Sequence, residues 1–355
     1  MRPILIFCRF GITIKASLLI LLMSFACLLL CSNKQLYAEP VVWEVLKPEF
    51  TERESYTQIY TLTTLFNDTA NPIMIQMQFT LTNLGISDQN AGCKILVLQK
   101  NVKPVFWNKR YGKKKWSYTK NTGQQLKIGL NYILIKDGKT MALIENDKIS
   151  AQITFDRTPD PIVPPMISLT SHNRFHESTV LIGCTKVQGV VKLPDGNSKK
   201  MVGYGVLELS KSTSFPSDIC RGWVTFRGYN FETNSYFLTS LRVLRGKTSE
   251  AEGWIWKKSV ETPSSISKIP FDFKIEKAVR EKPLFPYIIP IDSSFLLEPQ
   301  TLLTRYSIID ELGFFWGGIV KLVIGDPITY YYEAKVVLKE NSDTIPGILE
   351  FMWIE

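Results

Sequence analysis

The sequence predicts an antiparallel all-β protein made of two β-barrels in tandem, with few short helices. Three observations lead to this prediction. Apolar residues recur at every second position through most of the chain, Asp-Gly pairs stand between such runs, and helical periodicity is scarce. Many strands in series favour closed or nearly closed barrels, because closure removes exposed sheet edges.

An N-terminal segment precedes the predicted barrels. Residues 1–38 carry basic residues, then a charge-free run from Ala16 to Cys31, and end in Leu-Tyr-Ala, the layout of a signal peptide. We therefore expect cleavage before Glu39 and export to the periplasm or the extracellular space. The alternative is an uncleaved membrane anchor, although the run of 16 residues is shorter than the roughly 20 of a membrane helix.

The two predicted barrels divide the rest of the chain near its middle. We place the N-terminal barrel at residues 39–185 and the C-terminal barrel at residues 186–355. This length suits two domains, since one domain takes roughly 100 to 200 residues. The alternative boundary is the proline-rich stretch at residues 158–165.

Charge and cysteine content narrow the classes of function. Without residues 1–38 the chain has 38 basic and 33 acidic residues, and a formal charge of about +5 is too mild to indicate a nucleic-acid partner. Three cysteines then remain, Cys93, Cys184 and Cys220, too few for a disulfide framework. Either one bridge between Cys184 and Cys220 or buried thiols fit this count.

The clearest strand covers residues 73–82, where apolar and polar side chains alternate. This pattern predicts a strand with one face in the core and the other in water. Similar alternation surrounds Asp137-Gly138 and Asp195-Gly196, and each of these pairs predicts a hairpin turn.

A basic segment lies between Gln89 and Lys136, with eleven Lys and Arg residues and no Asp or Glu. One hypothesis is a loop that touches an anionic membrane surface, with aromatic rings at the interface. The alternative is a solvated hairpin whose aromatic rings pack beneath it. The residues assigned to the membrane surface are Trp107, Lys109, Arg110, Lys113, Lys114, Lys115 and Trp116.

Catalytic motifs are scarce. The two histidines of the chain, His172 and His176, would lie roughly 13 Å apart on an extended strand, too far to hold one metal ion. Neither Gly-x-Ser-x-Gly nor a P-loop occurs in the sequence. We therefore predict no metal, no cofactor and no nucleophilic site. Glu208, between Leu207 and Leu209, is a weak candidate for a catalytic acid.

Residues 203–226 (GYGVLELSKSTSFPSDICRGWVTF) resemble a segment of the survival-factor proteins, the AttH-like proteins and the carotenoid 1,2-hydratases. The matching features are the Gly-x-Gly pair at Gly203, the alternating strand after it, and Pro216 and Trp223, which are seven residues apart. Looser agreement extends over residues 55–260. The resemblance implies two lipocalin-like barrels in tandem.

The resemblance implies two functions, because the hydratases add water to carotenoids and the survival-factor branch is implicated in handling sphingolipids. Those sequences tend to carry a histidine after the glycine pair, whereas this chain has Leu209 there, and it has Ser217 after the proline. Both departures remove a proton-transferring group. They place hydratase-like acid catalysis in doubt and leave the binding function intact.

We therefore expect an exported, non-catalytic protein that binds or carries a hydrophobic molecule such as a lipid, since a small barrel with apolar inward residues encloses such a ligand. The alternative is a lipid- or isoprenoid-modifying enzyme of the carotenoid-hydratase type that uses Glu208. A third hypothesis is a structural protein whose barrels serve as surfaces for partners. The expected ligand-lining residues are Phe79, Leu81, Ile133 and Ile135 in the first barrel and Tyr204, Val206, Trp223 and Phe226 in the second.

Overall fold

The structure is a computed structural model of the full chain. It describes residues 44–50, 56–67, 73–83, 89–147, 149–165, 169–171, 174–192, 196, 198–243, 250–258, 261–270, 289–291, 294–307, 327–339 and 343–354. The predicted signal peptide and His172 lie outside these ranges. The chain divides into the units Met1–Glu44 and Val45–Glu355, and the sheets described below belong to the second. Within the described ranges, no helix has the length and apolar character needed to cross a membrane.

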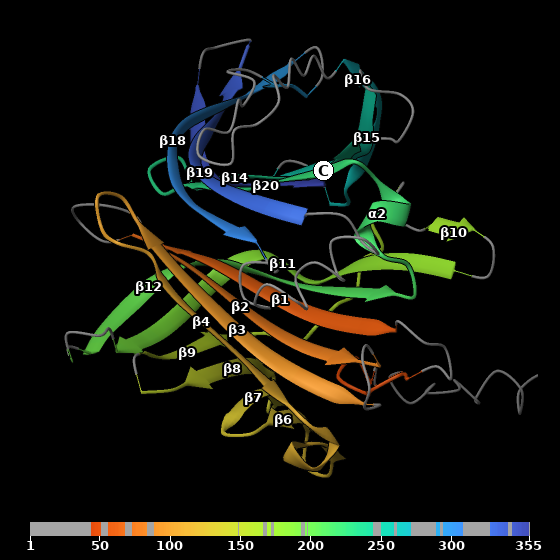
Figure 1. Cartoon of the computed structure of the whole chain (residues 1–355). Coiled ribbons are helices and arrows are strands. Elements are labelled where there is room, and N and C mark those ends of the chain that lie inside the picture. The colour runs from red at the N-terminus through yellow and green to blue at the C-terminus, as the bar shows by residue number, and fades with distance from the viewer. Residues whose placement is uncertain are drawn as a thin grey trace, which may run out of the picture. The chain divides into compact units, whose positions relative to one another are not determined.

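Two antiparallel sheets make up the unit Val45–Glu355 (Figure 1), so the all-β prediction is confirmed. The first sheet contains β1 (Thr57–Phe66), β2 (Ile73–Thr82), β3 (Asn90–Gln99), β4 (Val105–Tyr111), β5 (Trp116–Lys120), β6 (Gln124–Ile128), β7 (Asn131–Lys136), β8 (Lys139–Glu145), β9 (Ser150–Phe155), β10 (Leu169–Ser171), β11 (Arg174–Lys192) and β12 (Ser198–Ser212). The second contains β13 (Gly222–Asn230), β14 (Ser235–Val243), β15 (Glu250–Lys257), β16 (Ser264–Pro270), β17 (Ile289–Pro290), β18 (Phe295–Ser307), β19 (Pro327–Leu338) and β20 (Thr344–Ile354). The described helices are the short turns η1 (Lys113–Lys115) and α2 (Pro216–Ile219).

The first sheet has the strand order β4-β3-β2-β1-β12-β11-β9-β8-β7-β6-β5, with β10 beside β11. Two meanders are joined by the long hairpin β11–β12, which pairs with β9 on one side and with β1 on the other. Strand β3 also contacts β6 and β8 from across the interior. The sheet therefore curls into a nearly closed barrel, as the apolar alternation and the many strands led us to expect.

The hairpin turn predicted at Asp137-Gly138 lies where the sequence placed it, whereas Asp195 of the second predicted turn lies outside the described residues. Asp137 and Gly138 connect β7 to β8 with φ angles of 50° and 75°. Two successive positive φ angles belong to a type I′ turn, which matches the twist of the flanking strands. Gly196, in the connection between β11 and β12, also has a positive φ of 83°.

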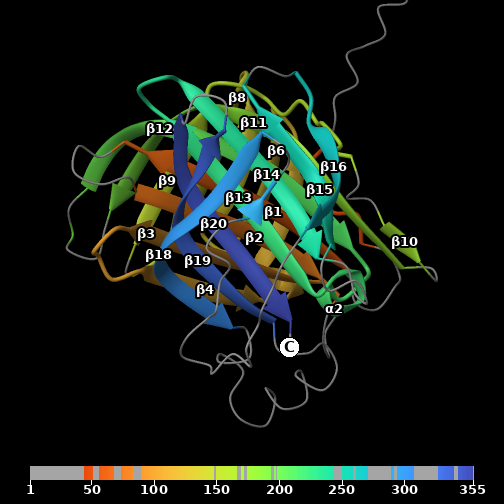
Figure 2. The ribbon, with the colours of Figure 1, turned by 90° about the horizontal axis from the view of Figure 1, so that it is seen from above.

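Each sheet has its own apolar core. The inward side chains of the first sheet form one cluster that extends from β1 through β9 to the hairpin β11–β12. A second cluster fills the concave side of β13, β14, β15, β18, β19 and β20, whose sheet order is β16-β15-β14-β13-β20-β19-β18-β17. Figure 2 shows both sets of strands from above. The period-two pattern thus produces two separate cores.

The outer faces of the two sheets also meet. Leu65 and Met74 of the first sheet cluster with Tyr229 and Tyr331 of the second, and a further cluster joins Val206 to strands β14 and β15. The expectation that the polar face of residues 73–82 lies in water is therefore wrong for Met74 and Gln76, which are 2% and 3% exposed. The second sheet covers this part of β2.

The chain passes from the first sheet to the second between Ser212 and Gly222, through α2. The boundary that we placed between residues 185 and 186 falls inside β11. The alternative at residues 158–165 also lies within the first sheet, where Ile162 forms an isolated bridge with Val180. Alternation along a strand does not specify which sheet the strand joins, because pairing depends on residues distant in the sequence.

Candidate functional site

The layer where the outer faces of the two sheets meet, here called the seam, contains polar side chains among apolar ones. Its polar members from the first sheet are Thr63, Gln76 and Glu208, and those from the second are Arg227, Ser240, Tyr331 and Glu350. Buried polar groups are costly unless they are hydrogen-bonded. Their partners therefore show how the seam is held together.

An ion pair between Glu208 on β12 and Arg227 on β13 crosses the seam. Arg227 donates from Nε to Glu208 Oε2 at 3.1 Å and from Nη2 to Glu208 Oε1. The Glu208 side chain is 15% exposed and the Arg227 side chain is 7% exposed. Nη1 of Arg227 donates to the carbonyls of Phe226 at 2.9 Å and Thr239 at 2.7 Å, and the guanidinium lies 5.4 Å from the ring centroid of Trp254.

This arrangement decides how Glu208 can act. Both of its carboxylate oxygens accept hydrogen bonds from a single guanidinium, the bidentate geometry of a strong ion pair. A general acid instead needs a proton on the carboxyl group and a path from that proton to the substrate. The contacts of Glu208 therefore suit a link between the sheets better than a proton donor.

A second polar group, formed by Gln76, Tyr331 and Glu350, also crosses the seam. Gln76 donates from Nε2 to Glu350 Oε2 at 2.9 Å, and the Tyr331 hydroxyl lies 3.3 Å from Gln76 Oε1 and 3.4 Å from Glu350 Oε1. Burial, and then the charge of Glu350, raise the pKa of Tyr331 well above its usual value. Tyr331 therefore stays protonated, and its hydroxyl donates a hydrogen bond within this group.

Two stacked tyrosines lie at one end of the seam. The ring centroids of Tyr204 on β12 and Tyr229 on β13 are 3.5 Å apart, and the ring of Phe231 meets both rings edge-on. Both hydroxyls donate to Oδ1 of Asn234, at 3.3 Å for Tyr204. Burial and hydrogen bonding with Tyr204 raise the pKa of Tyr229. The stack thus joins the two sheets through aromatic contact.

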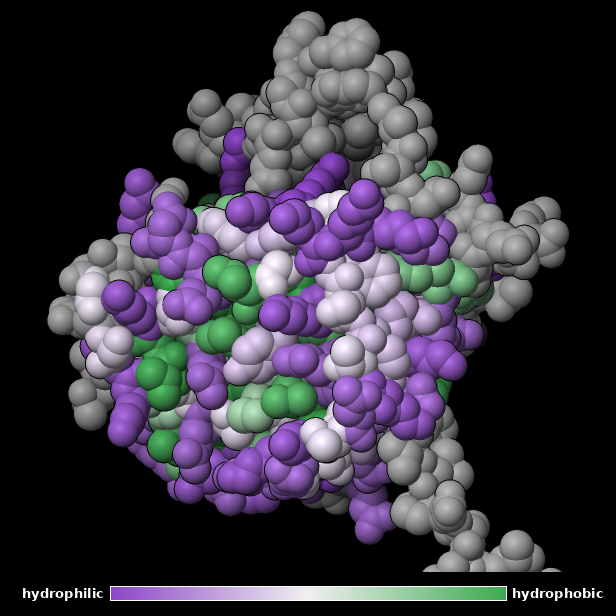
Figure 3. Space-filling view, turned by 90° about the horizontal axis from the view of Figure 1, so that it is seen from below, coloured by the Kyte–Doolittle hydropathy of each residue, from purple (hydrophilic) through white to green (hydrophobic). Residues whose placement is uncertain are grey.

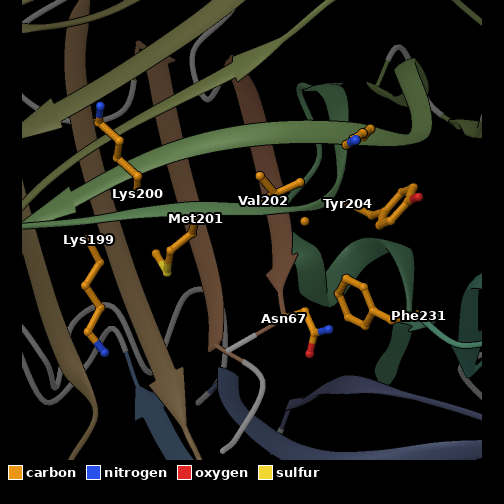
Figure 4. Close-up of a pocket in the computed structure, with 9 residues that line it drawn as sticks. Asn67, Lys199, Lys200, Met201, Val202, Tyr204 and Phe231 are labelled. Carbon is orange, nitrogen blue, oxygen red and sulfur yellow. The ribbon is translucent and has the colours of Figure 1, made fainter. Parts of the chain in front are cut away.

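Tyr204 lies between two hollows. On the inner side is a cavity of about 10 Å³, bounded by Tyr204, Cys184, Arg227 and Tyr229 among others, with room for about one water molecule. On the outer side is an open pocket of about 600 Å³ (Figure 4). Burial raises the pKa of the Cys184 thiol to about 12, so that Cys184 is protonated and unreactive at neutral pH.

The open pocket combines apolar and basic side chains. Its lining comprises Asn67, Lys186, Lys199, Lys200, Met201, Val202, Gly203, Tyr204 and Phe231. Figure 4 shows that Lys199 and Lys200 point to opposite faces of β12. The ammonium groups of these two lysines therefore do not converge on one point.

Comparison with known proteins shows that this chain resembles solved structures in its fold. No family model matches the sequence, and no curated protein matches it. A putative AttH protein from Nitrosomonas europaea superimposes with a TM-score of 0.61 at 13% identity, over 85% of this chain and 94% of its own. The chain shares the fold of this protein. The likeness that we inferred from residues 203–226 is thus confirmed at the level of the fold.

Two further proteins share this AttH fold. Kievitone hydratase from Nectria haematococca matches with a TM-score of 0.51 at 11% identity, over 83% of this chain and 88% of that chain. CghA, solved with Sch210972, matches with a TM-score of 0.54 at 9% identity, over 85% and 88% of the two chains. A binding protein and a hydratase are both compatible with this fold, so the function depends on the site.

The AttH fold distributes the expected ligand-lining residues among three places. Phe79, Leu81, Ile133 and Ile135 lie together in the core of the first sheet, and Phe226 lies in the core of the second. Tyr204, Val206 and Trp223 face the seam. Our assignment of Tyr204, Val206 and Trp223 to the interior of the second barrel is therefore wrong. Strand β12 belongs to the first sheet and turns Tyr204 and Val206 outward, and Trp223 lies on the face of β13 opposite to the core residue Phe226.

In the basic segment, the aromatic rings turn inward. Trp107 and Trp116 pack against the core of the first sheet, and Trp116 Nε1 donates to the carbonyl of Gln89 at 2.7 Å. The cations Lys109, Arg110, Lys113, Lys114 and Lys115 are exposed. This geometry is that of the solvated hairpin with packed rings, the alternative that we kept for this segment.

His176 on β11 is buried in the seam, where its ring lies 5.2 Å from that of Trp223. Burial, followed by the charge of Arg242, lowers the pKa of His176 to about 4. The described part of the chain contains no group of three His, Cys, Asp or Glu side chains that could hold a metal ion.

Sequence reasoning missed Arg227, Tyr229 and the group at Glu350. In the sequence each is an ordinary residue of an alternating strand, and nothing in its spacing indicates the partner on the other sheet. The Gly-x-Gly pair was the available signal. At Gly203 a Cβ would lie 2.1 Å from the carbonyl oxygen of Leu65, and this close approach of β12 to β1 precedes Tyr204 directly.

Proposed function

We propose that this protein binds a small amphiphile, such as a single-chain lipid, in the open pocket beside Tyr204, and that it does not transform this ligand. The pocket volume of about 600 Å³ lies within the range of about 300 to 1,000 Å³ that is typical of small-molecule sites. The observation that carries the proposal is the position of Tyr204, which forms the wall between this pocket and the seam.

The lining suits a molecule with one apolar and one polar part. Val202, Tyr204 and Phe231 offer a small apolar surface for a short alkyl chain, within a lining that is otherwise mainly polar. Lys186 and Lys199 at the rim supply ammonium groups for an anionic or strongly polar end. A fatty acid or a lysophospholipid has both parts.

The comparisons support a small-molecule ligand in general terms. One protein of the same fold was solved with the compound Sch210972, and another is named as a hydratase of kievitone. At identities of 9% to 13%, the chemistry of the ligand has to be argued from the lining of this chain.

A hydratase-type enzyme is the second candidate. The observation that favours it is the presence of two carboxyl groups, Glu208 and Glu350, inside the seam, where the Tyr331 hydroxyl lies 3.4 Å from Glu350 Oε1. Under this hypothesis a polyene substrate would be hydrated, and the replacement Glu208→Gln would abolish turnover. Turnover that persists in Glu208→Gln would remove Glu208 from this role.

The binding proposal is tested with cis-parinaric acid, a fluorescent fatty acid, titrated into the full chain. We expect saturable binding that weakens at least tenfold in Tyr204→Ala, because the apolar wall is removed. The matched control is Tyr118→Ala, which removes a half-buried tyrosine from β5, away from the pocket, and should bind like the parent chain.

Native mass spectrometry of the purified chain gives an independent measurement, with a bound lipid as the expected result. The proposal is overturned if the chain is recovered free of lipid and also fails to bind the probe. Equal affinity in Tyr204→Ala and Tyr118→Ala would place the ligand elsewhere.

A further inference from the structure

One outer face of the first sheet presents apolar side chains to solvent. It is formed by β7, β8 and the hairpin β11–β12, and we call it the docking face. Its apolar residues are Tyr132, Leu134, Met141, Leu143, Val190 and Val202. Val190 and Val202 are 46% and 52% exposed, and the other four are half-buried.

Strand register divides the apolar residues of this face into two groups. One lies on β7 and β8 and the other is Val190 and Val202 on the hairpin β11–β12, with Gln152 and Thr154 of β9 between them. Two neighbouring cross-strand ladders contain the six residues. The first runs Lys127, Tyr132, Leu143, Gln152, Val190, Lys200, and the second runs Gln125, Leu134, Met141, Thr154, Gln188, Val202. Residues directly opposite each other have Cβ atoms about 4.5 to 5.5 Å apart, so adjacent members of a ladder touch.

Charge is distributed unevenly on the docking face. Neither ladder contains an acidic residue, and the first begins and ends with a lysine, Lys127 and Lys200. Lys192 follows on the same side of β11, and it is exposed. Carboxylates lie at the margin: Glu145 ends β8, and Asp156 pairs with Lys139 at 3.0 Å.

The view from below shows hydrophobic side chains in several separate groups, with hydrophilic ones between and around them (Figure 3). Single exposed apolar residues are ordinary on a protein surface, but the four neighbouring apolar residues of β7 and β8, flanked by polar ones, form a set of the kind that marks an interaction site. Basic rims around apolar centres fit anionic bilayers, since ammonium groups contact lipid headgroups while apolar side chains enter the interface.

The geometry points to the docking face as a contact surface for an anionic lipid bilayer. Lys127, Lys192 and Lys200 contact the headgroups, and the apolar residues between them enter the interfacial layer. Lys200 and Val202 also line the open pocket, so the bilayer lies beside the pocket opening. In this respect the inference deepens the proposed function, because the ligand would come from the membrane.

Vesicle co-sedimentation of the full chain tests this inference, with phosphatidylcholine vesicles and with vesicles that also contain phosphatidylglycerol. Binding should require phosphatidylglycerol and should weaken as salt is raised. The double variants Lys127→Gln/Lys192→Gln and Leu134→Ser/Leu143→Ser should each weaken binding at least tenfold. The matched control Lys113→Gln/Lys114→Gln removes the same charge from η1 and should bind like the parent chain.

The result that overturns the inference is unchanged vesicle binding in both docking-face variants, whether or not the η1 variant loses binding. A second copy of the chain, as the alternative occupant of this face, would be detected by sedimentation in solution. If the parent chain sediments as a dimer and Leu134→Ser/Leu143→Ser is a monomer with unchanged vesicle binding, the face joins two copies of the chain. None of the four substituted docking-face residues lines the pocket, so cis-parinaric acid binding in these variants tests the proposed function separately.

Discussion

Arg227 on β13 holds both carboxylate oxygens of Glu208 on β12, so that a buried ion pair links the two sheets. The two residues are 19 positions apart in the chain and belong to different sheets. Removing one partner of such a pair leaves a buried charge without its counterion. Loss of this ion pair should therefore lower the stability of the seam.

We expect Glu208→Ala to lower the free energy of unfolding by about 3 kcal/mol, since Arg227 stays buried without its partner. The double variant Glu208→Ala/Arg227→Met should lose less than the sum of the two single variants. Urea unfolding of all four chains measures the coupling. Additive losses would show that the ion pair does not couple the sheets.

A pH effect should arise from His176. Its pKa in the folded chain is about 4, below the usual 6.5, so between these values the unfolded chain binds more protons than the folded one. Stability should therefore fall as pH decreases from about 6.5 to about 4, by about 3 kcal/mol in all. The variant His176→Gln should lose this part of the slope in pH-dependent unfolding; an unchanged slope would assign it to other groups.

The alkylation rate of the Cys184 thiol should show whether Tyr204 covers the cavity beside it. The thiol lies half-buried beside Tyr204 and Tyr229, and its raised pKa keeps the thiolate scarce, so alkylation by iodoacetamide should be slow. In Tyr204→Ala the rate at Cys184 should rise at least tenfold, as measured on its peptide by mass spectrometry. The buried Cys93 is the internal control and should not change. Equal rates in both chains would mean that Tyr204 does not cover the cavity.

Glycine 203 should tolerate no side chain. A Cβ there would lie 2.1 Å from the carbonyl oxygen of Leu65, and backbone cannot yield as a side chain can. We expect Gly203→Ala to cost about 2 kcal/mol or more in thermal or urea unfolding. Gly112→Ala is the control, because its Cβ would meet nothing within 4 Å. A neutral Gly203→Ala would mean that β1 and β12 can separate without cost.

Local pattern was sufficient for much of the fold. Alternation in residues 73–82 predicted a strand whose inward residues, Phe79 among them, lie in the core. Asp137-Gly138 predicted a tight turn because that turn needs two positive φ angles, which Asp and Gly tolerate better than most residues. Such features depend on residues that are close together in the chain, and a sequence displays those directly.

The site depended on tertiary structure. The sequence by itself determined the all-β class, the tight turn at Asp137-Gly138 and the alternation along each strand, since a period of two assigns alternate side chains to opposite faces. Which sheet β12 joins, and that its outer face meets β13, was decided by pairing between distant segments. Glu208 therefore looked like a candidate acid until Arg227 was seen beside it, because the partner of a seam residue lies on another sheet and leaves no mark in the local spacing.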